Sequence, residues 1–300
     1  MKIWMDGRVV GPEHATISVL DHGLLYGDGV FEGMRVIGGR LVDLEHHFAR
    51  LELSARAIYL ALPASRSQLV ELVGATVAAH GQPEAYVRLV VTRGVGRLGI
   101  DTASCQSPKI VCMADSIDLY GPAARQGVRL VTASRRRPDP DVLDPRVKSL
   151  NYLNNVLNKH EAKRRGGDEA LVLNRRGQVA EASAANVFVR QGRQLLTPPG
   201  TDGALEGITR RRLFLIAPEL GLEVIERSLT SVDLLAADEV FLTGSGAGIV
   251  PVVALDDVPI TAQDESVLPQ LQRETRRYAE RCGTPCLVPA PPPPPPPGPI

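Results

Sequence analysis

The 300-residue chain has no excess of charge, no long apolar run and few cysteines, and each absence excludes a class of protein. Its 34 lysine and arginine residues balance 34 aspartate and glutamate residues, so no overall field attracts nucleic acid or an anionic membrane. No segment approaches the roughly 18 consecutive apolar residues that span a bilayer, and the first residues contain no apolar signal-peptide core. We therefore expect a soluble, cytoplasmic protein without nucleic-acid or membrane partners.

Cysteine is also scarce, with four residues at positions too irregular for a zinc site. They are Cys105, Cys112, Cys282 and Cys286. So few cysteines in a chain of this length do not indicate a disulfide framework. We expect no metal site and ordinary free thiols, and a disulfide between Cys282 and Cys286 is the open alternative.

The length favours two domains, because a chain of this size exceeds one ordinary domain and buries about three quarters of its unfolded surface. Groups of strands with interspersed helices indicate an α+β fold rather than a regular βαβ repeat. We expect a small N-terminal α+β domain over 1–119, a connection over 120–132 and a large, β-rich α+β domain over 133–288. The proline-rich tail, 289–300, should form extended polyproline II outside the fold.

Periodicity predicts the main elements of both halves. In the first half, a hairpin turns at Asp6-Gly7, and apolar spacings of 4, 3, 4 and 3 predict a helix over 44–58 with Asp43 as its N-cap. Helix 66–80 and strands 85–92 and 109–114 follow. In the second half we expect helices after Lys148 and over 209–219. The strands expected there are 129–132, 169–174, 178–181, 186–189, 194–197, 223–228 and 239–242.

Two segments carry candidate chemistry. Lys148 lies between an extended, proline-containing segment and the start of a helix, and a lysine becomes a nucleophile where burial or a neighbouring cation favours its neutral form. Glu181 lies among small and apolar residues. A buried carboxylate needs a partner, and the cationic nitrogen of a pyridine ring would serve, since the pair would keep that ring an electron sink.

These two segments, Leu-Asp-Pro-Arg-Val-Lys-Ser-Leu-Asn-Tyr-Leu-Asn-Asn at 143–155 and Gly-Gln-Val-Ala-Glu-Ala-Ser-Ala-Ala-Asn-Val-Phe at 177–188, together resemble the class IV (fold type IV) pyridoxal-phosphate-dependent aminotransferases. The first segment is similar to the branched-chain amino acid aminotransferases. The resemblance extends from about Trp4 to about Asp256. It implies pyridoxal 5'-phosphate as cofactor, Lys148 as the Schiff-base lysine and catalytic base, and Glu181 as the partner of the ring nitrogen. It also implies a homodimer or larger homo-oligomer whose partner chain contributes to the active site.

The resemblance assigns further residues to the cofactor phosphate. A phosphate dianion needs a fixed cation and backbone donors such as those at a helix N-terminus. Arg50 would be the cation, Ile208 and Thr209 would supply amides and a hydroxyl at a helix start, and Thr243 opens a loop of small residues. Tyr152 is a further cofactor-binding candidate.

The substrate pocket implied by the resemblance combines aromatic walls with polar groups. It must accept an apolar side chain and then the second carboxylate of glutamate, for which Arg88 and Arg97 are the candidate partners. The other candidates are Tyr26, Phe31, Tyr86, Tyr120, Gly244 and Ser245.

The expected activity is ping-pong amino transfer between L-leucine, L-isoleucine or L-valine and 2-oxoglutarate. D-amino acid or (R)-amine transaminases and 4-amino-4-deoxychorismate lyase are the alternatives within the same fold. The D-amino acid enzymes tend to carry an arginine and a histidine two residues apart after Val-Thr-Arg-Gly, and here Leu98-Gly99 follows Arg97, so the histidine is missing. The chain also has Gly248 where its relatives usually carry Glu.

Overall fold

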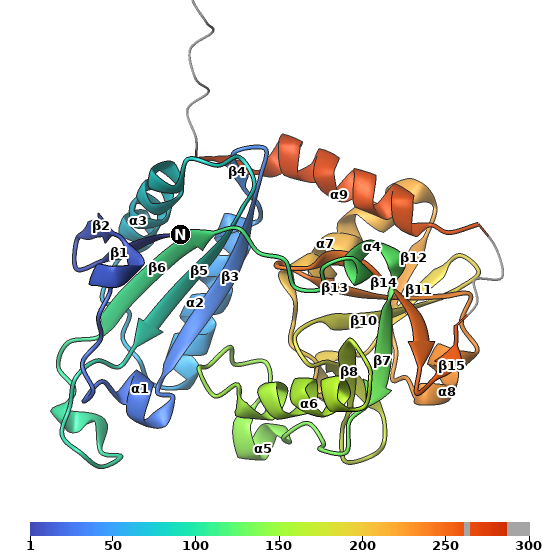
Figure 1. Cartoon of the computed structure of the whole chain (residues 1–300), viewed down its shortest axis with the longest axis horizontal. Coiled ribbons are helices and arrows are strands. Elements are labelled where there is room, and N and C mark those ends of the chain that lie inside the picture. Colours follow the sequence, from blue (N-terminus) through green and yellow to red (C-terminus); the bar gives the residue numbers. More distant parts are fainter. Residues whose placement is uncertain (261–264, 287–300) are drawn as a thin grey trace, which may run out of the picture.

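Two lobes lie side by side, each built on its own β-sheet (Figure 1). The computed structural model describes residues 1–260 and 265–286, so the predicted polyproline tail at 289–300 lies outside the described residues. The chain therefore has the mixed α+β architecture that the grouped strands and helices predict.

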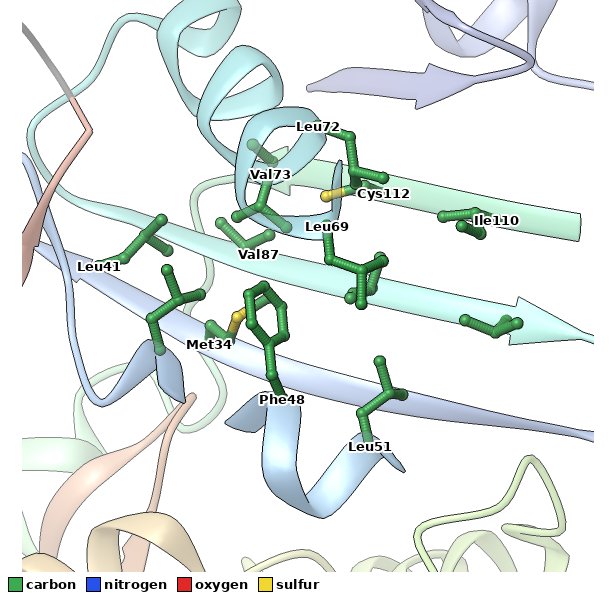
Figure 2. Packing of buried hydrophobic residues seen from close by; sticks show 14 of the residues in the cluster. Met34, Leu41, Phe48, Leu51, Leu69, Leu72, Val73, Val87, Ile110 and Cys112 are labelled. Atoms are coloured by element: carbon green, nitrogen blue, oxygen red, sulfur yellow. The ribbon is translucent and has the colours of Figure 1, made fainter. Parts of the chain in front are cut away.

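The first lobe contains an antiparallel seven-stranded sheet in the order β16-β4-β3-β5-β6-β1-β2. Two helices, α2 and α3, pack their apolar side chains on it, and Figure 2 shows Phe48, Leu69 and Val73 meeting Met34 and Val87 of the sheet. The strands are β1 (Lys2–Met5), β2 (Arg8–Val10), β3 (Gly29–Ile37), β4 (Arg40–Leu41), β5 (Ala85–Thr92), β6 (Lys109–Asp115) and β16 (Thr284–Pro285). The helices are α1 (His22–Tyr26), α2 (Leu44–Ala57) and α3 (Arg66–His80), with 3₁₀ turns at Pro12–His14 and Thr102–Ser104.

The second lobe contains a nine-stranded sheet in the order β12-β11-β10-β13-β14-β7-β8-β9, with β15 paired to β14. Its strands are β7 (Val128–Thr132), β8 (Glu169–Leu173), β9 (Val179–Ala182), β10 (Asn186–Gln191), β11 (Gln194–Thr197), β12 (Glu223–Glu226), β13 (Glu239–Gly244), β14 (Gly248–Leu255) and β15 (Val258–Pro259). Its helices are α4 (Ala123–Gln126), α5 (Pro140–Leu143), α6 (Leu153–Arg164), α7 (Ile208–Ile216), α8 (Ser231–Leu235) and α9 (Leu268–Cys282), with 3₁₀ turns at Gly200–Asp202 and Ala217–Leu220. Strand β7 falls inside the predicted connection, 120–132, and is part of this sheet.

The C-terminal helix α9 bridges the two lobes (Figure 1). Beyond it, β16 pairs with β4, so residues 284–285 of the predicted second domain belong to the sheet of the first lobe. Asp43 joins the same region, because its carboxylate accepts from Arg212 of α7 (2.6 Å) and from the Tyr278 hydroxyl of α9 (3.0 Å). Asp43 occupies the predicted N-cap position of α2, but its side chain makes no capping hydrogen bond.

The cysteines are free thiols in the structure, so the alternative of a Cys282–Cys286 disulfide is wrong. The Cys286 thiol instead donates to the Gly39 carbonyl (3.1 Å), and Cys282 is exposed. Burial raises the pKa of the Cys112 thiol to about 12, so this residue packs as a small apolar group. Among the described helices, none is long and apolar enough to cross a bilayer.

Candidate active site

A cavity of about 410 Å³ lies where the two lobes meet. It is lined from the first lobe by β3, α2 and β5, and from the second by the segment before α6, the start of α7 and the turn between β13 and β14. Most of the residues that the sequence predicts for the site line this cavity: Phe31, Arg50, Tyr86, Arg88, Lys148, Tyr152, Glu181, Ile208, Thr209, Thr243, Gly244 and Ser245. The cavity is large enough for a compact cofactor or a small substrate.

Lys148 is held at the cavity by its backbone. Its N–H donates to the Ser54 hydroxyl (3.0 Å), and its carbonyl accepts from Phe31 (3.0 Å), which attaches the segment to β3 of the other lobe. The side-chain Nζ donates to the Tyr152 hydroxyl (3.0 Å) and lies 4.5 Å from the centre of the Phe31 ring. The amine is therefore directed into the cavity by groups from both lobes.

The Tyr152 hydroxyl is buried among three cationic side chains. Burial alone would raise its pKa, but the neighbouring cations Lys148, Arg137 and Arg50 outweigh burial and lower the pKa. A phenol of this kind accepts a hydrogen bond from an ammonium group strongly and can hold or return its proton. Lys148 and Tyr152 thus form a hydrogen-bonded pair within the cavity.

Arg50 belongs to a buried charge network. Glu32 is fully buried; its Oε1 accepts from Arg50 Nε (2.7 Å), and its Oε2 accepts from both Arg50 Nη2 (2.8 Å) and the His47 ring (2.6 Å). Arg50 Nη1 donates to the Glu206 carbonyl (2.9 Å). Burial lowers the pKa of His47, so the ring donates to the carboxylate as a neutral group, while Glu32 outweighs burial at Arg50 and raises its pKa. The guanidinium is fixed in one orientation, and two of its five N–H groups remain for a ligand.

Beside Arg50, the start of α7 forms a corner that suits an anion. The N-cap Gly207 has extended backbone and no side chain, so the first amides of α7, those of Ile208 and Thr209, are open to the cavity. The Thr243 hydroxyl is buried and has no hydrogen-bond partner among the described residues. An unpartnered buried hydroxyl beside a fixed guanidinium and free amides fits a phosphate group.

Glu181 is held by three groups. Its Oε1 contacts the Arg137 guanidinium, and its Oε2 accepts from Asn186 Nδ2 and from the Leu205 N–H (both 3.1 Å). Burial lowers the pKa of Arg137 to about 10. A carboxylate has about four acceptor positions, so Glu181 can still accept one further donor from the cavity. This fits a protonated ring nitrogen.

Arg88 and Tyr86 stand on β5 at the substrate side. The Arg88 guanidinium donates to the Tyr86 hydroxyl (Nε 3.2 Å, Nη2 3.0 Å) and lies 4.5 Å from the centre of the Phe31 ring. Among the described residues, no carboxylate forms an ion pair with Arg88. The cavity therefore carries a cation on an otherwise aromatic and apolar wall, which Ile117 and Leu119 extend.

Three predicted site residues lie outside the cavity. Tyr26 accepts from the Gly99 N–H (2.8 Å) on the surface, next to Arg97, whose carbonyl bonds the His22 ring (2.9 Å). The side chain of Tyr120 packs against the second lobe, where its hydroxyl donates to the Glu169 carboxylate (2.9 Å). The Tyr120 side chain thus has a packed, satisfied environment of its own, and Ile117 and Leu119 of the same segment reach the cavity instead.

The sequence reasoning missed Glu32, His47, Arg137 and Asn186, which hold the charged residues in place. Only Glu32 gave a signal, because a carboxylate in the middle of the apolar stretch 30–36 needs a buried partner. The roles of the other three residues could not be recognised from the sequence, because their partners are known only from the folded structure.

A lysine directed at a tyrosine, a corner that suits phosphate and a buried carboxylate meet in one cavity, as expected of an enzyme that acts on amines. The comparisons agree with this class. The chain belongs to the amino-transferase class IV family, whose family model matches residues 29–255. It is an aminotransferase.

Individual relatives show the same resemblance. The branched-chain-amino-acid aminotransferase of Pseudomonas aeruginosa is 35% identical over 267 residues, covering 87% of this chain and 86% of the relative. The D-alanine aminotransferase of Bacillus licheniformis is 32% identical over 256 residues, covering 85% and 89%. The crystal structure of the branched-chain aminotransferase of Thermoproteus uzoniensis with norvaline superposes with a TM-score of 0.85 at 36% identity, covering 92% of this chain and 93% of that one.

Proposed function

We propose that this protein transfers the amino group of L-leucine, L-isoleucine or L-valine to 2-oxoglutarate, in a ping-pong reaction with pyridoxal 5'-phosphate. The observation that carries the proposal is the cavity in which Lys148, Glu181, Arg50 and Thr243 converge. The named branched-chain relatives support the donor class, although a D-alanine enzyme is nearly as similar in sequence. The residues that line the pocket give further support for the donor class.

The described residues can hold each part of the cofactor. Arg50, the Ile208 and Thr209 amides and the Thr243 hydroxyl would bind the phosphate, and Glu181 would accept from the ring nitrogen and keep it protonated. When bound, the cofactor supplies an electrophilic aldehyde carbon and a ring that withdraws electrons. Lys148 would attach it covalently as a Schiff base.

Lys148 would also move the proton. Its amine, when not bound to the cofactor, would take the proton from the substrate α-carbon and deliver it to the cofactor's C4′ carbon. Tyr152, 3.0 Å from Nζ, would keep the amine oriented and share its proton. General acid–base assistance of this kind contributes roughly 10²–10⁴-fold.

The pocket suits two different substrates in turn. The Phe31 ring and the side chains of Ile117 and Leu119 offer apolar contacts to a branched aliphatic chain. Arg88 would pair with the second carboxylate of glutamate or 2-oxoglutarate, while Gly244 and Ser245 are close to the shared α-carboxylate.

Replacing Arg88 with methionine should lower the activity toward L-glutamate much more than the activity toward L-leucine. A charge-assisted hydrogen bond contributes about 1.5–3 kcal/mol, so kcat/KM for L-glutamate should fall about 10- to 150-fold. For L-leucine the change should stay within about threefold, because the methionine keeps the apolar stem. Half-reaction rates with each amino acid give both numbers from one preparation. Equal losses for both donors would exclude a role in recognising the second carboxylate.

The visible absorption of the purified holoenzyme tests the donor assignment directly. L-leucine, D-alanine and (R)-1-phenylethylamine are added separately, and the cofactor band should disappear with L-leucine alone and return with 2-oxoglutarate. A response mainly to D-alanine or to the amine would keep the family and overturn the donor. Release of pyruvate from 4-amino-4-deoxychorismate without an amino acceptor would establish the lyase instead.

We also propose a homodimer whose partner completes the substrate site. Tyr26 and the loop after Arg97 meet on the surface through Gly99, beside exposed apolar side chains, Leu98 (75% exposed) and Ile100 (86%). A patch of this kind is typical of a protein interface. It would carry Tyr26 and Arg97 to the cavity of a second chain.

Sedimentation of the wild type should therefore report a dimer or a larger assembly. The double substitution Leu98→Asp and Ile100→Asp should dissociate it, since charges replace the apolar contact. Tyr59→Asp is the matched control, because Tyr59 is equally exposed (92%) but lies just beyond the end of α2. A monomeric wild type would disprove the proposal.

A further inference from the structure

A second cavity, of about 250 Å³, lies beside the substrate cavity. Its walls come from β3, the start of α7, the turn between β13 and β14, and the bridging helix α9 (Figure 1). Thr209, Gly244 and Ser245 line both cavities. The turn 244–248 is therefore a structural element that the two cavities share.

The arginines that line the second cavity are not all paired with carboxylates among the described residues. Three arginines line it, of which Arg212 is paired with Asp43 (2.6 Å) and Arg276 with both Glu84 (3.3 Å) and Glu280 (3.7 Å). Arg35 has no ion pair with any described carboxylate, and its Nη1 donates to the Gly246 carbonyl (3.1 Å). An anion in this cavity would meet a cation that has no counter-ion within the described part of the fold.

The remaining lining combines aliphatic side chains with polar residues: His47, Glu84, Thr209, Ser245, Gln272 and Thr275. Ile37, Val42 and Ile249 supply aliphatic surface. The Thr275 hydroxyl is buried and has no hydrogen-bond partner in the described part of the chain. Arginines and a free hydroxyl beside aliphatic side chains suit a ligand with one anionic end and one apolar end.

Gly248 leaves this cavity open. It sits at the turn with a φ of +74°, and a Cβ built on it would meet nothing within 4 Å. Gly248 lines the second cavity and is not among the residues that line the substrate cavity. Its lack of a side chain therefore enlarges the space in front of Arg35 and Arg276 rather than the substrate pocket.

We propose that this second cavity binds a small aliphatic carboxylic acid, with the carboxylate at Arg35 and Arg276 and the tail against Ile37, Val42 and Ile249. The ligand competes with the Gly246 carbonyl for Arg35 and so loosens the turn that carries Gly244 and Ser245. Because coupling between two sites is reciprocal, a substrate in the first cavity changes the affinity of the second. The site is thus an effector site for acids that resemble the branched-chain substrates, and its existence does not depend on which amino donor is correct.

Calorimetric titration of the holoenzyme with 4-methylpentanoate tests the proposal. This acid has neither an amino nor an oxo group, so it binds without reacting. Two saturable processes per chain are expected, one in each cavity. A single process per chain would overturn the proposal.

Two variants assign the second process. Arg276→Gln should weaken it about tenfold or more through the lost charge-assisted contact, and Thr275→Val should weaken it roughly threefold with almost no change in shape. Arg277→Gln is the matched control, because this neighbouring arginine is 68% exposed and pairs with Glu274 outside the cavity. If both test variants titrate like the wild type, the second process does not belong to this cavity and the proposal is wrong.

Discussion

Replacing Lys148 with alanine should reduce transamination between L-leucine and 2-oxoglutarate to a trace. Lys148 is the lysine among the residues that line the cavity, and Tyr152 and Phe31 hold its amine in place. The variant loses the group that would attach the cofactor and the base that would move the α-proton. Loss of the base alone costs roughly 10²–10⁴-fold in rate.

The rate should be measured over a single turnover with the cofactor in excess, so that weaker binding does not hide the chemical step. Lys163→Ala is the control, because this surface lysine (56% exposed) pairs with Asp168 away from the cavity. Added methylamine should restore part of the rate in Lys148→Ala, since a small amine can occupy the vacated volume and carry the proton. Retention of more than trace activity without added amine would remove Lys148 from its assigned role.

Functional residues that lie within a recognisable local sequence pattern could be predicted from the sequence. Lys148, Glu181 and the start of α7 each lie within a local pattern, and all three line the cavity. Tyr26, Arg97 and Tyr120 were implied by the family resemblance, and the structure places them outside the cavity of this chain. Their side-chain directions depend on long-range packing: the Tyr120 hydroxyl is taken by Glu169, which lies 49 residues away.

The supporting network could not be found in this way. Glu32 lies on β3, and its partners His47 and Arg50 lie on α2, so their contact exists only after the helix has packed on the sheet. Arg137 is one of three consecutive arginines, and nothing local distinguishes the one that turns inward to Glu181. Such choices are made by tertiary contacts rather than by local propensity.

Several elements of the fold were absent from the sequence-based prediction, and β14 and α9 were missed for different reasons. Strand β14 is central to its sheet although it contains Pro251, a residue that argues against a central strand. Helix α9 could have been predicted from the sequence. Its apolar residues Leu268, Leu271 and Tyr278 follow a helical spacing, and Pro269 stands in its first turn, where proline is favoured. This helix closes the second cavity and connects the lobes, so its omission also concealed the proposed effector site.

Replacing Glu32 with glutamine should destabilise the protein by about 3–5 kcal/mol, the usual cost of leaving one member of a buried ion pair without its partner. Glutamine keeps the size of the side chain but removes the charge, and its amide hydrogens would face the N–H groups of Arg50 or His47. Burial alone would raise the pKa of Glu32, but Arg50 and His47 hold it well below its ordinary value.

The sign of the pH dependence follows from this lowered pKa. The stabilisation by Glu32 is complete above the unfolded-state pKa of about 4.5 and is lost as the pH falls through the folded-state value. The Glu32→Gln variant should therefore lose stability at neutral pH, and the difference from the wild type should shrink in acid. Equilibrium urea denaturation of the two proteins at pH 7 and at pH 4 measures both effects.

Glu52→Gln is the matched control for this prediction, because Glu52 makes the same kind of pair with Arg66 at the surface, where both side chains are more than a third exposed. Exposed pairs contribute about 0–1 kcal/mol. The affinity for pyridoxal 5'-phosphate should also fall in Glu32→Gln, since Arg50 loses the carboxylate that fixes its orientation, while the control should bind normally. A Glu32→Gln protein within about 1 kcal/mol of the wild type at pH 7 would mean that Arg50 finds another partner, and that the network does not determine its position.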